Sequence, residues 1–565
     1  MTPAPAPASA LTLALAWPLR DPWRWITGGA LAFFLLFVVL PLLSLFSESF
    51  VGQRSGVFGL ENYLTFFGSS YFRRALFNSL TIGVAGTSIA LLLGVPLAYI
   101  CARNAIPGMP VLRVMIIMAM MSPPFIGAYA WIILFGRSGL VTQLGRSLGL
   151  DMPTIYGPGG IALVTALHTY PVVFMITYAA FRRVDRTLEE AAQNLGRDRF
   201  GVLRTVTLPL VMPALLTSAL LVFLGIISDF GTVNLLGEGE RFPVLATLAF
   251  ALYLNEIGEE PGMAATTSVV LLLIAFTVIL VQRVLVARRS VVNDGAQPPL
   301  RKELAGAARV LVPGYVFLVA LVSNLALIVV LTTSVLQTRG AVFHPVFTLE
   351  NYTGALAILS DALTNSVVYS TTALAAIVVA GALVGYLISR RDTVMTRLLD
   401  LLVMIPYIVP GTVLGIGYAA TFNGPYIILT ATAAIIILVY IVRRIPYLIR
   451  AAAAIVLQID PSVEEASINL GVSPLRTFLK VMVPLMGPGL IAGATLAWIE
   501  VFNELSASIV LYTAFTRTLP VATYQEVFAG NFGTAAALAA MLIMITAAAL
   551  ALFTWLGGAD KDMTI

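Results

Sequence analysis

The stretch Glu-Glu-Ala-Ala-Gln-Asn-Leu-Gly at residues 189–196 returns as Glu-Glu-Ala-Ser-Ile-Asn-Leu-Gly at residues 464–471. Each copy is followed by an apolar run that contains a proline, Pro209 after the first copy and Pro484 after the second. The matched positions keep one spacing of 275 residues, as 190 with 465, 196 with 471 and 209 with 484 show. A long internal repeat of this kind indicates two equivalent structural units in one chain.

The composition places these two units in a membrane. The chain has 565 residues, 59% hydrophobic and 11% charged, with a mean hydropathy of +0.94, whereas soluble domains carry roughly 25% charged residues. A water-soluble fold could not bury so much apolar surface in its core, so we interpret the chain as an integral membrane protein. The lone Cys101 and the two histidines exclude a disulfide framework and a cysteine-rich or histidine-rich metal site. We expect no resident metal and no nucleic-acid partner, because membrane topology explains the net charge of +5.

Apolar windows of about 20 residues predict an all-α protein with about twelve transmembrane helices, six in each half. In the first half these windows lie near residues 26–46, 79–101, 113–135, 159–180, 208–236 and 263–285. In the second half they lie near residues 309–333, 366–388, 398–421, 426–455, 483–512 and 533–556. The predicted domains are an N-terminal tail at 1–25, a first domain at 26–287, a linker at 288–308 and a second domain at 309–565.

The basic residues predict the orientation of these helices. With the N-terminus, the even-numbered loops, the linker and the C-terminus placed in the cytoplasm, 25 of the 33 basic residues are cytoplasmic and the other 8 are outside. Arg443 and Arg444 fall within a predicted span, and without them the excess is still 23 against 8. Because cytoplasmic loops are enriched in Lys and Arg, we predict a multi-pass inner-membrane protein with both termini and both repeated blocks in the cytoplasm.

Each repeated block has the pattern of a short helix at the membrane surface. Leu188 and Leu195 share a helical face with the small residues between them, and small residues let another surface approach closely. The paired glutamates suit the start of a helix, and Gly196 and Gly471 suit its left-handed cap. The prolines that follow are expected to start the next span. A surface helix without a partner is the alternative, but two matched copies favour a docking role.

The two blocks resemble the EAA loop of bacterial ABC importer permeases. Glu190-Ala191-Ala192, Gly196 and Leu208-Pro209 match its pattern, and the second copy differs by Ser467 for alanine and Val483 for leucine. The resemblance covers nearly the whole chain and implies two tandem six-helix permease domains of the type I importer fold, a layout similar to ferric-iron, thiamine and phosphonate permeases. It also implies that two coupling helices dock on ATPase subunits through Glu189, Glu190, Ala191, Ala192, Gly196, Glu464, Glu465, Ala466, Ser467 and Gly471.

The chain carries no ATPase motif. A phosphate-binding P-loop needs Gly-Lys followed by Ser or Thr, and the three lysines, Lys302, Lys480 and Lys561, follow Arg, Leu and Asp. The resemblance therefore implies a transport subunit with no catalytic residue and no cofactor of its own. It further implies two copies of a cytoplasmic ATPase that bind ATP and Mg²⁺, a periplasmic or lipid-anchored substrate-binding protein, and surrounding membrane lipid.

Acidic residues late in two predicted spans are candidates for the transport pathway. Asp229 and Glu504 are equivalent at the 275-residue spacing, Glu500 lies one helical turn before Glu504, and Asn503 adds a polar neighbour. Charges inside spans are costly and usually face the bundle interior or water, and hard cations prefer oxygen ligands. The alternative is that these side chains fix the fold through hydrogen bonds between helices. On the pathway interpretation, Glu504→Ala should impair uptake more than folding.

Two arginines and several prolines interrupt the predicted spans. Arg443 and Arg444 occupy the positions that His168 and Thr169 hold in the first half. They could attract an anion, or they could neutralise an acid such as Glu500. Prolines are expected to break the third and ninth spans, at Pro123-Pro124 and at Pro406 to Pro410.

The most concrete prediction is the permease subunit of an ATP-driven, binding-protein-dependent importer of ferric iron that works by alternating access. The same architecture could import phosphonate, sugar phosphate or thiamine. An ion-coupled secondary transporter is a different class, but it gives no reason for two loops of the EAA type.

Overall fold

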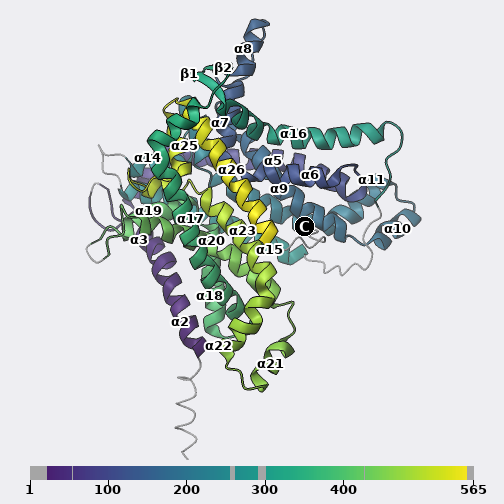
Figure 1. Ribbon diagram of the computed structural model, residues 1–565, viewed down its shortest axis with the longest axis vertical. Helices are drawn as coiled ribbons and strands as arrows, with labels where there is room; N and C mark the ends of the chain where they lie inside the picture. The colour runs from purple at the N-terminus through teal and green to yellow at the C-terminus, as the bar shows by residue number, and fades with distance from the viewer. Residues whose placement is uncertain are drawn as a thin grey trace, which may run out of the picture.

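The computed structural model describes residues 22–53, 55–254, 261–289, 301–340, 342–424 and 427–556, and these are almost entirely helical (Figure 1). The first half comprises α2 (Pro22–Phe34), the π-helical turn η1 (Leu35–Val39), α3 (Leu40–Ser49), α4 (Glu61–Gly68), α5 (Ser70–Arg103), α6 (Met109–Met121), α7 (Pro124–Phe135), α8 (Leu140–Ser147), α9 (Pro158–Arg183), α10 (Arg186–Asn194), α11 (Arg199–Val202), the π-helical turn η2 (Leu203–Thr207), α12 (Leu208–Ile227), α13 (Gly231–Gly237), η3 (Glu238–Glu240), α14 (Leu245–Tyr253) and α15 (Pro261–Arg289). The second half comprises α16 (Ala308–Ser334), β1 (Leu336–Arg339), β2 (Val342–Phe347), α17 (Glu350–Arg390), α18 (Val394–Ile408), α19 (Gly411–Thr421), α20 (Ala433–Val456), α21 (Pro461–Asn469), α22 (Pro474–Thr477), the π-helical turn η4 (Phe478–Met482), α23 (Val483–Phe502), α24 (Ser508–Leu511), α25 (Leu519–Phe528) and α26 (Phe532–Leu556). Most of the predicted tail and much of the predicted linker lie outside the described residues.

Ten of the described helices are long and apolar enough to cross a membrane, or eleven if the bent pair α18 and α19 is one span. The remaining predicted span, at 426–455, corresponds to α20. That helix carries Arg443, Arg444 and Arg450 and is not among the ten. The third and ninth spans are broken at prolines as predicted: α6 ends before Pro123-Pro124, and α18 and α19 meet at 109° around Pro410. Pro406 stays inside α18, so it does not cause the break.

The fifth and eleventh spans end earlier than predicted. The expected ends were near residues 236 and 512, but α12 ends at Ile227 and α23 at Phe502. Asp229 and Glu504 therefore lie just beyond the helices rather than within them, which corrects the prediction. Each carboxylate accepts a backbone N–H three residues on, from Thr232 at 3.3 Å and from Ala507 at 3.1 Å. A side chain that captures an amide in this way competes with continuation of the helix.

The same two spans begin earlier than predicted. Pro209 and Pro484 were expected to start them, but the π-helical turns η2 and η4 run straight into α12 and α23. The helices are thereby continuous from Arg199 and from Pro474. A proline lacks the N–H of a regular helical turn, and a π-helical turn with its longer hydrogen-bonding step accommodates that defect.

Each half is built on three mutually packed helices, α5, α9 and α12 in the first and α17, α20 and α23 in the second. Glycines allow the backbones to approach closely. A Cβ atom on Gly94 of α5 would lie 2.8 Å from Cβ of Val173, and one on Gly385 of α17 would lie 2.6 Å from Cβ of Ala452. Tight contact between small residues is how helices associate in lipid, where the hydrophobic effect offers no net drive.

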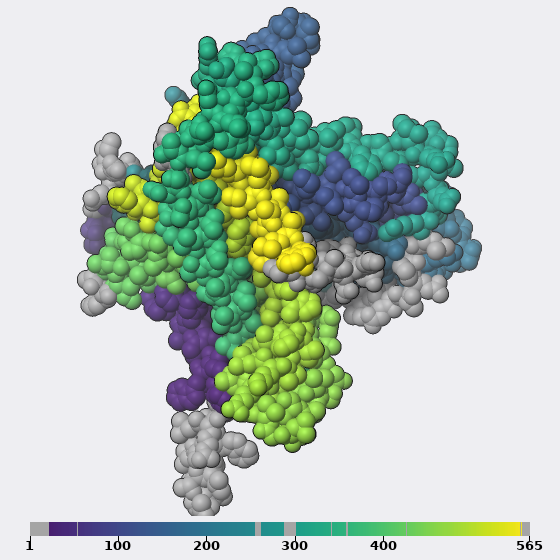
Figure 2. Space-filling view, in the orientation of Figure 1, coloured from purple at the N-terminus to yellow at the C-terminus, as the bar shows by residue number. Residues whose placement is uncertain are grey.

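The first helices of each half pack on the other half. α2 and α3 contact α18 and α19, whereas α16 contacts α6 and α7, and Figure 2 shows α16 in teal along the blue surface of the first half. Hydrogen bonds support both contacts: Tyr418 OH donates to the Phe37 carbonyl at 2.6 Å, and Asn324 Nδ2 donates to the Met115 carbonyl at 2.8 Å. This reciprocal packing of the first helices holds the two halves together.

The repeated blocks and the two-stranded sheet lie at different ends of the molecule. α10 and α21 lie at two separate extremities, while α8 and the hairpin of β1 and β2 lie together at the top of Figure 1. β1 and β2 are antiparallel, with Gln337 opposite His344. The hairpin is a small departure from the predicted all-α architecture within the described residues.

Candidate functional site

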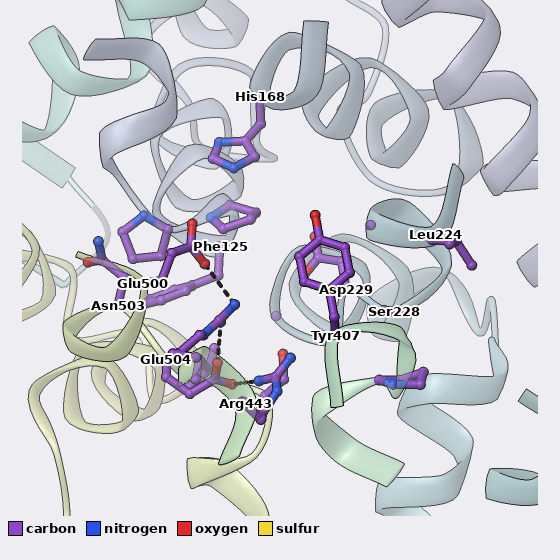
Figure 3. Close-up of a pocket in the computed structure, with 18 of the residues that line it drawn as sticks. Phe125, His168, Leu224, Ser228, Asp229, Tyr407, Arg443, Glu500, Asn503 and Glu504 are labelled. Atoms are coloured by element: carbon purple, nitrogen blue, oxygen red, sulfur yellow. Dashed lines mark hydrogen bonds and ion pairs between the residues drawn. The ribbon is translucent and has the colours of Figure 1, made fainter. Parts of the chain in front are cut away.

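A cavity of about 310 Å³ lies between the two halves, where the broken helices meet the early ends of α12 and α23 (Figure 3). Both halves contribute to its walls, including α9 and α12 from the first and α20 and α23 from the second. The four residues that the sequence predicts for a pathway all line this one cavity. The polar lining consists of Ser122, His168, Ser228, Asp229, Tyr407, Arg443, Arg444, Tyr447, Glu500, Asn503, Glu504 and Ser506.

The second half lines the cavity with a buried ion-pair network. Arg444 Nη2 lies 2.5 Å from Glu504 Oε2, and Arg444 Nη1 lies 2.9 Å from Glu500 Oε2. Arg443 pairs with the other carboxylate oxygen of Glu504. The Glu504 side chain is only 3% exposed, whereas that of Glu500 is 45% exposed. The two arginines thus neutralise acids, as one of the two sequence interpretations held.

The first half presents its acid without such a partner. One oxygen of Asp229 accepts the Thr232 N–H, while the other is shielded from solvent and makes no hydrogen bond with any described residue. The side-chain oxygen of Asn503 is likewise unpartnered, although its Nδ2 donates to the Met121 carbonyl at 3.3 Å. Asp229 lies across the cavity from Glu500 and Asn503 (Figure 3). Two acceptor oxygens therefore remain available to a positively charged or hydrogen-bond-donating ligand.

The two halves line the cavity with different charges, because their sequences differ at one turn of α9 and α20. Where the second half has Arg443 and Arg444, the first has His168 and Thr169, and His168 also lines the cavity. Three carboxylates face two guanidinium groups, which leaves an excess of one formal negative charge. In the described part of the chain, no three His, Cys, Asp or Glu side chains come together as a metal-binding group.

The repeated blocks form the exposed helices α10 and α21. Asp185 caps α10 by accepting the Thr187 N–H at 2.9 Å, and Asp460 caps α21 by accepting the Ser462 N–H at 2.8 Å. That hydrogen bond lowers the pKa of the Asp460 carboxyl. Gly196 and Gly471 end the helices with φ of +85° and +86°, as the cap prediction required. Sequence reasoning missed both capping aspartates, although they share the 275-residue spacing.

The paired glutamates of each block point in different directions. Glu189 Oε1 lies 2.5 Å from Arg103 Nη2 and accepts the Thr207 hydroxyl at 2.6 Å, so it ties α10 to α5 and η2. Glu464 accepts the Tyr386 hydroxyl and lies 3.5 Å from Arg390 Nε, both on α17. In contrast, Glu190 pairs within α10 with Arg186, and Glu465 is exposed. The first glutamate of each pair therefore anchors the helix to the membrane domain.

The basic anchors were missed by sequence reasoning. Arg103 and Arg390 are the last residues of α5 and α17, and they are 287 residues apart, the same spacing as Asn78 and Asn365. That spacing marks the two arginines as equivalent positions, but it does not indicate that they pair with the glutamates.

Apolar side chains remain uncovered on the anchored helices. Leu195 and Leu470 are each 85% exposed, and Leu188 and Val463 are also exposed on the same elements. Ala191, Ala466 and the half-buried Ala192 and Ser467 add small side chains to the blocks. The two blocks therefore expose apolar and small side chains at equivalent positions.

Comparisons with known proteins agree with the repeat. The family described as "Binding-protein-dependent transport system inner membrane component" matches residues 94–291 and again residues 377–559. The ferric transport system permease protein FbpB of Actinobacillus pleuropneumoniae is 30% identical, over 95% of this chain and 79% of that protein. The Fe(3+)-transport system permease protein FbpB 2 of Haemophilus influenzae is 23% identical, over 94% of this chain and 97% of that protein. A solved bacterial ABC transporter involved in alginate import is 21% identical over 50% of this chain and 96% of that chain, with a TM-score of 0.38.

Proposed function

The chain belongs to the family of binding-protein-dependent transport system inner membrane components, as a fused two-domain ABC importer permease, and from this premise we propose that it carries ferric iron. Relatives named as ferric permeases match along nearly the whole chain.

The observation that carries the proposal is the charge of the cavity between the halves. The charges of its two arginines are neutralised by Glu500 and Glu504, although Arg443 Nη1 and Arg444 Nε make no hydrogen bond with the described residues. Asp229 keeps an unpartnered carboxylate oxygen in the same cavity. Hard oxygen donors match the preference of a small, highly charged cation. Phosphonate and sugar phosphate are disfavoured by this arrangement, whereas cationic thiamine would share the electrostatic fit.

The proposed mechanism couples the cavity to a separate ATPase. Two ATPase copies, which bind ATP and Mg²⁺, would dock on α10 and α21 through the exposed leucines and small residues. Closure of the ATPase dimer would draw these two extremities together, and the anchors Glu189 and Glu464 would pass the movement to α5 and α17. The halves would then alternate between outward and inward access to the cavity. A periplasmic or lipid-anchored binding protein would deliver the substrate, with both termini in the cytoplasm.

The direct test is uptake of radiolabelled ferric iron into proteoliposomes that contain this chain, its ATPase and its binding protein. We expect accumulation that requires ATP hydrolysis and the binding protein. Thiamine, a phosphonate and a sugar phosphate serve as competing substrates in matched vesicles. ATP-dependent accumulation of one of these, but not of iron, would contradict the substrate assignment. Accumulation driven by an ion gradient without ATP would contradict the importer itself.

The anchoring glutamates provide a prediction for coupling. The double variant Glu189→Gln/Glu464→Gln should keep the ATPase bound but reduce the iron transported per ATP hydrolysed by at least about tenfold, because each lost charge-assisted hydrogen bond weakens the anchor by about 1.5–3 kcal/mol. The measurement is the ratio of uptake to ATP hydrolysis in proteoliposomes. The double variant Glu303→Gln/Glu350→Gln, at two exposed glutamates outside the repeated blocks, is the matched control and should leave that ratio nearly unchanged. Equal ratios in the two double variants would show that anchoring does not transmit the movement.

A further inference from the structure

Two arginines from separate parts of the chain contact one tyrosine near the end of α9, and a third arginine lies nearby. Arg113 of α6 and Arg301, which precedes α16, donate from Nη2 to the Tyr178 hydroxyl oxygen at 3.2 and 2.9 Å. The guanidinium of Arg113 also lies 5.8 Å from the centre of the Tyr178 ring. Arg182, one helical turn after Tyr178, is within electrostatic reach of both arginines. Like charges gathered in this way repel, so the cluster needs a counter-charge.

Arg113 and Arg301, the two arginines that contact Tyr178, find no such counter-charge in the described part of the chain. Neither Arg113 nor Arg301 has an acidic partner among the described residues. The neighbouring acid Glu189 is taken by Arg103 and Thr207. Because the Tyr178 oxygen already accepts two hydrogen bonds, its own proton is available for donation. The cluster therefore presents hydrogen-bond donors to any ligand that enters it.

The corresponding position in the second half carries an acid in place of an arginine. At the 287-residue spacing, Arg113 is replaced by Asp400, whose Oδ1 lies 2.9 Å from Arg450 Nη2. At the 275-residue spacing, Tyr178 and Arg182 are replaced by Ala453 and Leu457. The donor cluster is thus particular to the first half and is not a general consequence of the repeat.

The surroundings indicate which anion fits. Arg113 lies within an exposed apolar strip on α6, and Arg301 precedes α16, which packs against α6 and carries a second such strip. The strips consist of Val111, Val114 and Met118 on α6 and of Val310, Leu311 and Leu318 on α16. We propose that the Arg113–Tyr178–Arg301 cluster binds the phosphate of an anionic phospholipid whose acyl chains cover these strips. Arginine forks match phosphate oxygens well, and basic pockets between transmembrane helices at a membrane surface hold such head groups.

The bound lipid would secure the connection between the two halves. Arg301 belongs to the connecting segment, and the next residue pairs with the end of α5: the Lys302 N–H donates to the Arg103 carbonyl at 2.8 Å, and the Ala105 N–H donates to the Lys302 carbonyl at 2.9 Å. A phosphate between Arg113 and Arg301 would add a charged link to this backbone contact. The inference is independent of the transported substrate.

The test is lipid binding to the full chain in a neutral detergent, followed by native mass spectrometry. We expect phosphatidylglycerol to bind at least about tenfold more tightly than phosphatidylcholine, and Arg113→Gln/Arg301→Gln to remove most of that preference. The matched control Arg146→Gln/Arg339→Gln removes the same charge from two exposed sites elsewhere and should keep it. If the double variant does not fold, the single variant Arg301→Gln, at an exposed position, should still weaken phosphatidylglycerol binding selectively. Equal binding by wild type and variant would overturn the proposal, as would inorganic phosphate competing as strongly as the lipid.

Discussion

Asp229→Asn is expected to reduce ferric-iron uptake by at least about tenfold while the chain stays folded and bound to its ATPase. The substitution preserves the shape of the side chain and its hydrogen bond from the Thr232 N–H. It removes the one cavity carboxylate that no arginine of the described chain neutralises. A unit charge at about 4 Å contributes on the order of 4 kcal/mol at an effective dielectric constant of about 20, so even a partly screened loss is large for a multivalent cation.

Uptake by proteoliposomes, measured at several iron concentrations, checks this expectation. Asp229→Glu restores the charge and should recover part of the uptake. Glu238→Gln is the matched control, because it removes one carboxylate from an exposed position near the end of α13 that does not line the cavity. If Asp229→Asn transports iron as well as Glu238→Gln does, Asp229 is not on the pathway and the charge argument fails.

The repeat made the global architecture and the pairing of sites predictable. Matching two blocks at a fixed spacing was enough to predict two equivalent helices with glycine caps and to relate Asp229 to Glu504. The proline positions likewise predicted where the third and ninth spans break. These features depend on local spacing, which the sequence displays directly.

Features that depend on tertiary contact were not predictable from spacing. Nothing near Glu189 in sequence indicates that it reaches Arg103 while Glu190 stays on the surface. The sequence-based prediction placed the ends of α12 and α23 too late, because apolar residues continue beyond them. The helix ends became visible only from the backbone N–H groups that Asp229 and Glu504 accept in the structure. The packing of α2 and α16 against the opposite half could not be predicted either, since in the sequence both helices are simply apolar spans.

Glu504→Ala is expected to destabilise the protein by about 3–5 kcal/mol, the cost typical of breaking a buried ion pair. Glu504 is almost fully buried, pairs with both Arg443 and Arg444, and accepts a hydrogen bond from the Ala507 N–H. Its removal would leave Arg443 without an acidic partner and Arg444 with only the half-exposed Glu500. The sequence alone suggested that this variant would lose uptake more than folding, and the contacts now favour the opposite order.

Thermal unfolding in detergent measures this effect, with the repeat-equivalent Asp229→Ala as the comparison. Asp229 has no arginine partner among the described residues, so its truncation should cost much less stability than that of Glu504. The double variant Glu504→Ala/Arg443→Ala should recover part of the loss, because it removes one of the two buried cations along with the acid. Equal destabilisation by Glu504→Ala and Asp229→Ala would show that the ion pairs add nothing to stability, and Glu504 would then return to the pathway as a substrate-facing acid. The opposite result would indicate that the two equivalent acids have different roles, with Glu504 stabilising the cavity and Asp229 contacting the substrate.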